Sequence, residues 1–146
     1  MKRNRFIIGA VFLLLALTGT AQDFIGMQAE EIKKQMRAGH KDFALDETTK
    51  NKVYKYLKYV DGLETRTILF FLSDEDICTY YRIIYESELY NQVVQQLDST
   101  CLKVSDTLWV QEDNGKRYRK ELKQHDWFFT VTTRPDTTEA LEKKEK

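Results

Sequence analysis

The chain has 146 residues with 23 basic and 23 acidic side chains, so its formal net charge at pH 7 is zero. Nucleic-acid-binding surfaces need an excess of Lys and Arg, so this balance argues against a nucleic-acid partner and against strong attraction to anionic membranes. The length suits a single domain with one hydrophobic core.

The first residues have the organisation of an export signal. A basic stretch over Lys2–Arg5 precedes the apolar run Phe6–Leu17, which is too short to span a bilayer comfortably. Gly19-Thr20-Ala21 supplies the small residues that a signal peptidase recognises. We expect residues 1–21 to be a signal peptide, Gln22 to begin the mature chain, and the protein to be periplasmic or secreted, without stable membrane insertion after cleavage. An uncleaved membrane anchor is the alternative, and a lipoprotein is not expected because no cysteine follows the apolar run.

Two segments have the apolar spacing of amphipathic helices. In the first, Gln28–Arg37, the apolar stripe consists of Ala29, Ile32 and Met36. In the second, Glu88 to about Asp98 with Ser87 as its cap, the stripe consists of Leu89, Val93 and Leu97.

Most of the remaining chain predicts β-strands, because β-branched and aromatic residues alternate or cluster between turn signals. The central feature is a hairpin from Thr67 to about Tyr85, whose first arm Thr67–Leu72 is apolar on both faces. The other expected strands are Val53–Asp61, Leu102–Glu112, Lys116–Lys123 and Trp127–Thr133, with Phe43–Leu45 as a short strand or a loop that fills the core.

This order predicts tandem αβββ units that join into one α+β domain, an antiparallel sheet with both helices on one face. The domain is expected to cover residues 22–134. The charged stretch after it, residues 135–146, is expected to be disordered.

Cys78 and Cys101 are the two cysteines of the chain. Export into an oxidising compartment would allow them to form a disulfide. Two separate buried thiols are the alternative, since a disulfide requires their Cα atoms to come within a narrow range of distances.

The segment Phe24-Ile25-Gly26-Met27-Gln28-Ala29-Glu30-Glu31-Ile32 resembles the start of the helix in SmpA/OmlA (BamE-like) and β-lactamase-inhibitor-like domains. The resemblance implies a small envelope or secreted α+β module that acts by binding proteins. The chain differs from these families in lacking a second Gly-Met pair and a lipid-anchor cysteine. As a whole it is similar to small exported proteins of unknown function of Bacteroidetes type, which implies an envelope location and no activity.

Motifs for catalysis and cofactor binding are absent from the sequence. It contains no G-x-G-x-x-G, G-x-x-x-x-G-K-[ST] or G-x-S-x-G motif and no spacing typical of metal ligands, so we expect no cofactor, no metal and no enzymatic activity. His125 beside Asp126 could orient a general base, which leaves a hydrolase with an unmarked site as a minor alternative. His40 lies beyond the end of the first helix.

Aromatic residues make up 12% of the chain, and their abundance is the main sequence signal for binding. Alternation allows only about half of the strand side chains to face the helices, so some aromatic residues must lie on the other sheet face. The leading hypothesis is therefore a non-enzymatic binding module for an envelope or extracellular protein. The alternative is a small-ligand carrier with a pocket between helices and sheet.

The hairpin register decides which residues form the expected binding face. If Asp113-Asn114-Gly115 is a three-residue loop, Trp109 lies opposite Arg119 on the open face, with Phe128 on the same face. Trp109, Arg119 and Phe128 are then the predicted partner-binding residues. In this register the helix-facing side chains are Leu108, Val110, Tyr118, Leu122, Trp127, Phe129 and Val131. A two-residue turn would shift the pairing by one residue and could bring Trp109 to the helix side.

Overall fold

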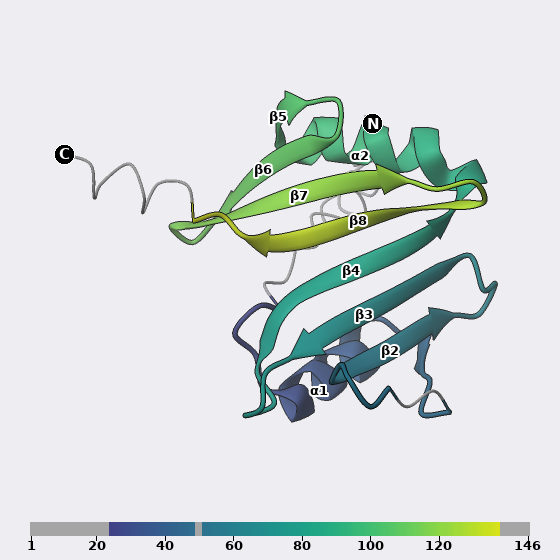
Figure 1. Ribbon diagram of the computed structural model, residues 1–146, viewed down its shortest axis with the longest axis vertical. Helices are drawn as coiled ribbons and strands as arrows, with labels where there is room; N and C mark the ends of the chain where they lie inside the picture. The colour runs from purple at the N-terminus through teal and green to yellow at the C-terminus, as the bar shows by residue number, and fades with distance from the viewer. Residues whose placement is uncertain (1–23, 49–50, 138–146) are drawn as a thin grey trace, which may run out of the picture.

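The computed structural model describes residues 24–48 and 51–137 (Figure 1). The expected signal peptide and most of the expected charged tail lie outside these residues. The elements are α1 Ala29–Gly39, β1 Phe43–Leu45, β2 Tyr56–Asp61, β3 Arg66–Leu72, β4 Cys78–Glu86, the 3₁₀ turn η1 Ser87–Leu89, α2 Tyr90–Thr100, β5 Leu102–Ser105, β6 Leu108–Asp113, β7 Lys116–Gln124 and β8 Phe128–Pro135. The predicted α+β class with an antiparallel sheet is confirmed.

The strands form one eight-stranded sheet in the order β1-β2-β3-β4-β8-β7-β6-β5, and every neighbouring pair is antiparallel. Two meanders, β1–β4 and β5–β8, therefore meet through their last strands at the middle of the sheet (Figure 1). Each described helix precedes four strands, where the sequence pattern predicted three. The pairing of β4 with β8 joins residues about fifty positions apart, so only tertiary packing could establish it.

The extra strand in the second meander arises from a turn inside a segment that the pattern predicts to be one strand. The predicted strand Leu102–Glu112 is divided at Asp106 and Thr107 into β5 and β6. The backbone N–H of Thr107 donates a hydrogen bond to the Ser105 hydroxyl at 3.3 Å, which is the local interaction that favours a turn at serine.

Helix α1 forms because its apolar stripe can be buried against the first meander. The side chains of Ile32 and Met36 are buried among the large apolar residues of β2, β3 and β4. We call this set the N-terminal core: Phe24, Ile32, Met36, Tyr59, Ile68, Phe70, Cys78 and Tyr81. Just before the helix, Gly26 has φ +90°, a conformation that glycine adopts without strain, and its N–H donates to the carbonyl of Cys78 at 2.8 Å.

Helix α2 buries Val93 and Leu97 against the second meander. The C-terminal core consists of Val93, Leu97, Trp109, Leu122, Phe129 and Val131. The Trp109 side chain is 0% exposed, and its Nε1 donates a hydrogen bond to Asp98 Oδ1 of α2 at 2.9 Å. The indole therefore fills the space between helix and sheet and also satisfies its polar atom.

The predicted location of Trp109 on an open face is wrong, because the β6–β7 turn has two residues. Asp113 pairs with Lys116, and Asn114 and Gly115 both have positive φ, 51° and 77°, as a type I′ turn requires. Trp109 consequently pairs with Lys120 rather than Arg119. Since side chains alternate, this one-residue shift turns Leu108 and Val110 away from the core.

The predicted position of Trp127 is also wrong. The pattern predicts that Trp127 faces the helices at the start of the last strand, but β8 begins at Phe128 and the Trp127 side chain is 86% exposed. The neighbouring turn uses backbone pairing instead, with the His125 N–H donating to the Phe128 carbonyl at 2.8 Å.

The two cysteines belong to different halves of the fold. Cys78 is buried in the N-terminal core, whereas Cys101 packs at the edge of the C-terminal core. Both are thiols in this structure, so the disulfide that the sequence allowed is not formed here.

Candidate functional site

Aromatic side chains line up on the face of β2, β3 and β4 that points away from the N-terminal core. Phe71 pairs with Tyr56 on one side and with Tyr80 on the other. The Phe71 and Tyr80 rings stack with centroids 4.4 Å apart and planes 13° apart, and Tyr54 and Tyr56 contact Phe71 at 6.4 and 6.0 Å. We call these four residues the aromatic row; three of them are partly exposed and Tyr54 is exposed.

Arginines continue this row across β4, β8 and β7. The Arg134 guanidinium lies 4.2 Å from the centre of the Tyr80 ring, which is a cation–π distance. Arg82 donates a hydrogen bond to Thr132 Oγ1 at 2.9 Å and lies 5.9 Å from the Phe71 ring. Together with Arg119, these residues form what we call the arginine group.

Arg119 and Arg134 are direct cross-strand partners of β7 and β8. Like charges directly opposite each other destabilise a sheet by a few tenths of a kcal/mol or more. Within residues 24–48 and 51–137, neither arginine has a carboxylate at ion-pair distance. Two arginines are therefore cross-strand neighbours beside the aromatic row.

The structure does not bring the predicted binding residues together. Arg119 is partly exposed opposite Arg134, but Trp109 is buried in the C-terminal core. Phe128 is exposed at the other end of β8, six residues before Arg134, which corresponds to about 20 Å along a strand. The aromatic row was missed because both faces of β3 and β4 are aromatic, and only the strand order reveals which rings become neighbours.

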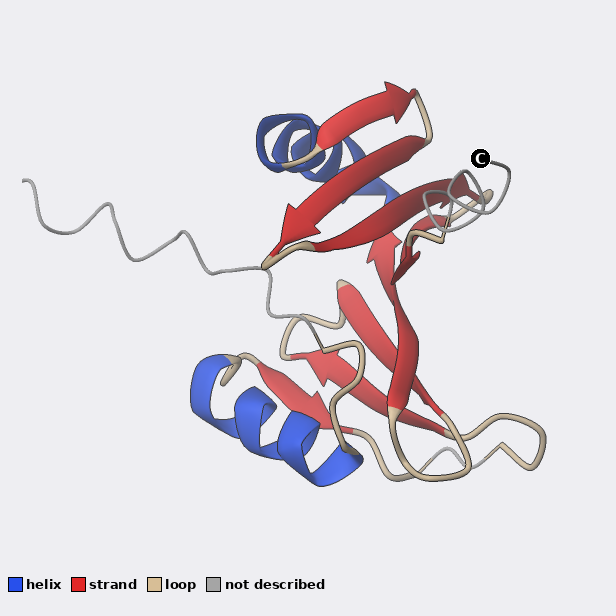
Figure 2. Ribbon diagram, turned by 90° about the vertical axis from the view of Figure 1, so that its left-hand side faces the viewer, coloured by secondary structure: helices blue, strands red, loops and turns tan. Residues whose placement is uncertain are grey.

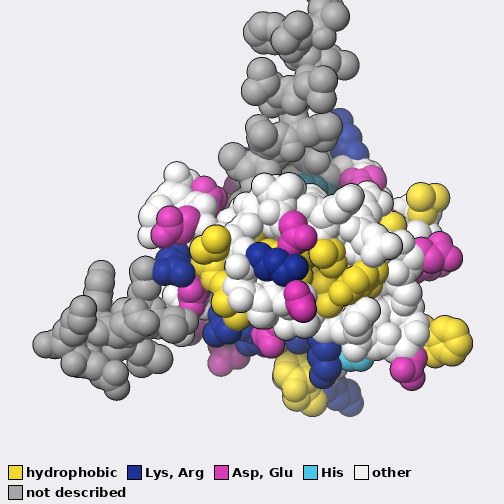
Figure 3. Space-filling view, turned by 90° about the horizontal axis from the view of Figure 1, so that it is seen from above, with side chains coloured by type: hydrophobic (Ala, Val, Ile, Leu, Met, Phe, Trp, Pro, Cys, Tyr) yellow, Lys and Arg dark blue, Asp and Glu magenta, His cyan; other side chains and the backbone are white. Residues whose placement is uncertain are grey.

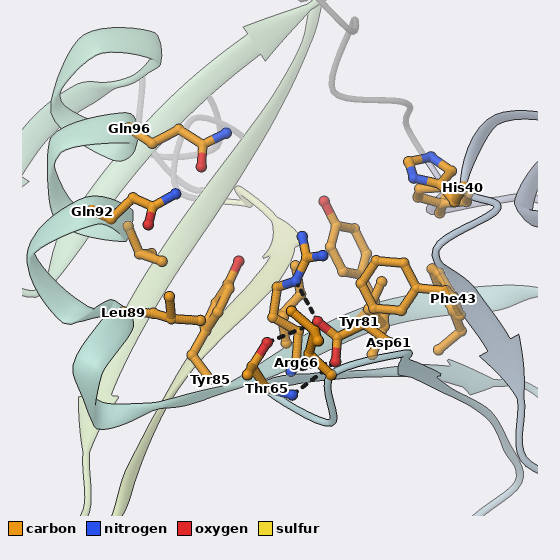
Figure 4. A pocket seen from close by; sticks show the side chains of 16 residues that line it. His40, Phe43, Asp61, Thr65, Arg66, Tyr81, Tyr85, Leu89, Gln92 and Gln96 are labelled. Atoms are coloured by element: carbon orange, nitrogen blue, oxygen red, sulfur yellow. Dashed lines mark hydrogen bonds and ion pairs between the residues drawn. The ribbon is translucent and has the colours of Figure 1, made fainter.

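A second feature is a cleft of about 580 Å³ between α2 and the segments around β1 (Figure 4). Its apolar lining comes from both halves of the molecule: Phe24, Phe43, Leu63, Ile68, Phe70, Ile83, Leu89 and Val93. Its polar and ring-hydroxyl lining consists of His40, Asp61, Thr65, Arg66, Tyr81, Tyr85, Gln92 and Gln96.

The two charged residues of the cleft neutralise each other. Arg66 Nε donates to Asp61 Oδ2 at 2.9 Å, and Thr65 donates from both its N–H and its hydroxyl to the same carboxylate. Desolvation by burial acts to raise the pKa of Asp61, but these hydrogen bonds outweigh it and hold the pKa below its usual value. Arg66 also donates to Asp42 at 2.8 Å and lies 4.8 Å over the Phe43 ring.

Uncharged polar groups face this pair across the cleft. The Tyr85 ring stacks on Phe129 with centroids 5.0 Å apart, so its direction is set by the core, and its hydroxyl points into the cleft (Figure 4). Burial raises the pKa of Tyr85 to about 12, so the hydroxyl stays protonated at neutral pH. Gln92 and Gln96, one turn apart on α2, extend their amides toward the same space (Figure 4).

The histidines take separate positions. His40 lines the cleft, with its ring 6.0 Å from Phe24. His125 stacks on the Phe128 ring at 4.4 Å in the β7–β8 turn. In the part of the chain that the structure describes, no cluster of three or more His, Cys, Asp or Glu residues could hold a metal ion, and no helix is long and apolar enough to cross a membrane.

A scan against protein-family models, a search of curated proteins and a search of solved structures each returned no match.

Proposed function

We propose that the protein is an exported, non-enzymatic binding module that holds a protein or peptide on its open sheet face. The face is the one that carries the aromatic row and the arginine group. Ile68, Ile83 and Val131 are successive cross-strand partners on β3, β4 and β8. Cross-strand partners lie on the same face of a sheet. This register therefore supports the proposal that the core-facing side chains share one face and leave the other face open. The proposal is also supported by Figure 2, where α1 and α2 are drawn on the same side of the sheet.

The observation that carries the proposal is the opposed pair Arg119 and Arg134 beside the stacked rings of Tyr80 and Phe71. Tyrosine and arginine are enriched among the residues that dominate binding energy at interfaces. A carboxylate from a partner would relieve the repulsion between the two guanidinium groups and could accept hydrogen bonds from both. The partner class that this surface favours is therefore a segment with an acidic residue next to an apolar or aromatic one.

Other exposed surfaces fit this role less well. Leu102 and Val104 are exposed on the edge strand β5, but Lys103 between them pairs with Asp106 at 3.4 Å. Viewed from above, hydrophobic side chains are interspersed with charged ones (Figure 3). A charged residue on an edge strand opposes the addition of another strand.

The test is affinity capture from the native envelope with Arg119→Glu as the decisive variant. The change turns a repulsive cross-strand pair into an attractive one, so the free energy of unfolding should rise by roughly 0.2–1 kcal/mol. Capture of the partner should nevertheless be lost, because the partner's carboxylate would then meet a negative charge. This combination of higher stability and lost binding distinguishes a binding residue from a structural one.

The matched control is Arg37→Glu, which makes the same change of charge on the exposed last turn of α1. It should leave capture unchanged. Equal capture by the Arg119→Glu variant and the unmodified protein would contradict the proposal. A hydrolase with an unmarked site is a minor alternative, and it requires an activity that survives purification and falls when His125 is changed.

A further inference from the structure

The cleft lies between the two hydrophobic cores instead of inside either of them. Compact domains usually have one contiguous core. Here Ile83 and Tyr85 of β4 adjoin different cores, and both also line the cleft. On the helix side the cleft is bordered by Gln92 and Gln96, which are both exposed to solvent, so the space is open there.

The volume and lining are those of a small-molecule site. Ligand pockets typically measure about 300–1,000 Å³ and combine an apolar lining with a few convergent polar groups. The cleft, at about 580 Å³, has Ile68, Phe70 and Val93 as apolar wall residues. Its residues come from segments between Phe24 and Gln96, so the ligand would contact both halves of the molecule.

The charges in the cleft indicate an uncharged ligand. Both oxygens of Asp61 already accept hydrogen bonds, from Thr65 and from Arg66. Arg66 is held between two carboxylates, those of Asp61 and Asp42. Neither charge is therefore available as the main counter-ion for a charged ligand, because binding one would require breaking an existing pair.

The hydrogen-bonding groups on the wall formed by β4 and α2 are neutral. The Tyr85 hydroxyl can donate or accept, and the amides of Gln92 and Gln96 can do both. Figure 4 shows these three side chains directed into the same space. Such a wall suits a ligand with a hydroxyl or carbonyl group, while the apolar wall suits a ring or an acyl chain.

We propose that this cleft binds an uncharged small molecule with an apolar ring or acyl body and one hydroxyl, amine or carbonyl group. The site is separate from the open sheet face, and it does not depend on the binding role proposed for that face. A ligand there would join the two cores and so stabilise the folded protein by mass action.

Two dyes of matched shape test the proposal on the purified protein. Phenylnaphthylamine is neutral and has an apolar body with one N–H, and anilinonaphthalene sulfonate adds a negative charge to the same body. Both become fluorescent in apolar surroundings. We expect saturable binding of the neutral dye and at least about tenfold weaker binding of the charged one, which would have to be desolvated without a free counter-ion.

Variants of α2 then locate the dye. Gln96→Trp should fill the cleft and weaken binding of the neutral dye by about tenfold or more. Gln95→Trp is the matched control, because Gln95 and Gln96 are both exposed on α2 but only Gln96 lines the cleft; it should change the affinity by less than about twofold. Tyr85→Phe keeps the ring stacked on Phe129 and removes one hydrogen-bonding group, so it should weaken binding by about two- to tenfold.

Three results would overturn the inference. The first is absence of saturable binding of the neutral dye. The second is an equal loss of affinity in the Gln95→Trp and Gln96→Trp variants when circular dichroism shows both folded. The third is tighter binding of the charged dye, which would mean that Arg66 serves as a counter-ion. A Gln96→Trp variant that does not fold leaves the Tyr85→Phe variant to decide, and an unchanged affinity there would also count against the proposed site.

Discussion

Replacing Trp109 with alanine should remove a large part of the protein's stability. A buried aromatic side chain covers about 150–250 Å² of surface, which at about 25 cal/mol per Å² corresponds to roughly 4–6 kcal/mol. Residual compactness of the unfolded chain lowers such sums by about 10–40%. The expected loss is therefore about 3–5 kcal/mol, in the range observed when large core side chains are truncated. Trp109 is 0% exposed in the folded protein, so its whole side chain counts as buried in this sum.

Urea unfolding followed by far-ultraviolet circular dichroism measures the loss. Trp127→Ala is the matched control, since Trp127 is the other tryptophan and is 86% exposed; its effect should stay within about 0.5 kcal/mol. Trp109→Phe keeps a ring in the core and serves if the alanine variant does not fold. A loss below about 1.5 kcal/mol for Trp109→Ala would refute the reasoning. It would mean that the β6–β7 hairpin has a three-residue loop and that Trp109 lies on the open face.

Asp61→Asn should lower the free energy of unfolding by roughly 2–3 kcal/mol, because a buried carboxylate that accepts hydrogen bonds from Thr65 and Arg66 is replaced by a neutral amide. The pKa of Asp61 is lower in the folded protein than in the unfolded chain, so its stabilisation is present above about pH 4 and disappears as the pH falls through the folded pKa; a variant as acid-sensitive as the parent would contradict this. Thiol titration of the unfolded, unreduced protein should find both Cys78 and Cys101 reactive, whereas no reactive thiol would indicate the disulfide. Intact mass of the exported protein should correspond to a chain that begins at Gln22, and a mass that includes residues 1–21 would refute signal cleavage.

Local sequence signals were sufficient for the helices and for most strands. Ile32 and Met36 recur at the helical period and are both buried, because an amphipathic segment has one face that it can cover. Asn114-Gly115 was recognised as a turn, and it is one. The signal for its type was also present, since Asn-Gly is the preferred pair when two consecutive residues must have positive φ. The three-residue loop Asp113-Asn114-Gly115, on which the predicted register depends, is one residue longer than the turn in the structure.

That single residue changed the candidate site. Strand side chains alternate with a period of two, so a one-residue shift exchanges the two faces of a strand. Trp109 moved into the core, and the expected group of Trp109, Arg119 and Phe128 was dispersed. The hydrophobic pattern of a single strand does not reveal the free-energy cost of a wrong register. That cost arises only when a helix packs against the strand, because a large side chain is then either buried under the helix or exposed to solvent.

The sequence by itself determined the local character of the chain: which segments are helical, which are extended, and that aromatic residues exceed what one buried sheet face can hold. The tertiary structure decided which segments meet. Tyr80 and Arg134 become neighbours through the pairing of β4 with β8, and Tyr85 and Gln96 face each other because β4 and α2 border the same cleft. The physical reason is that periodicity depends on residues a few positions apart. Long-range pairing depends on the total area buried and the loops closed, and these quantities exist only for the whole fold.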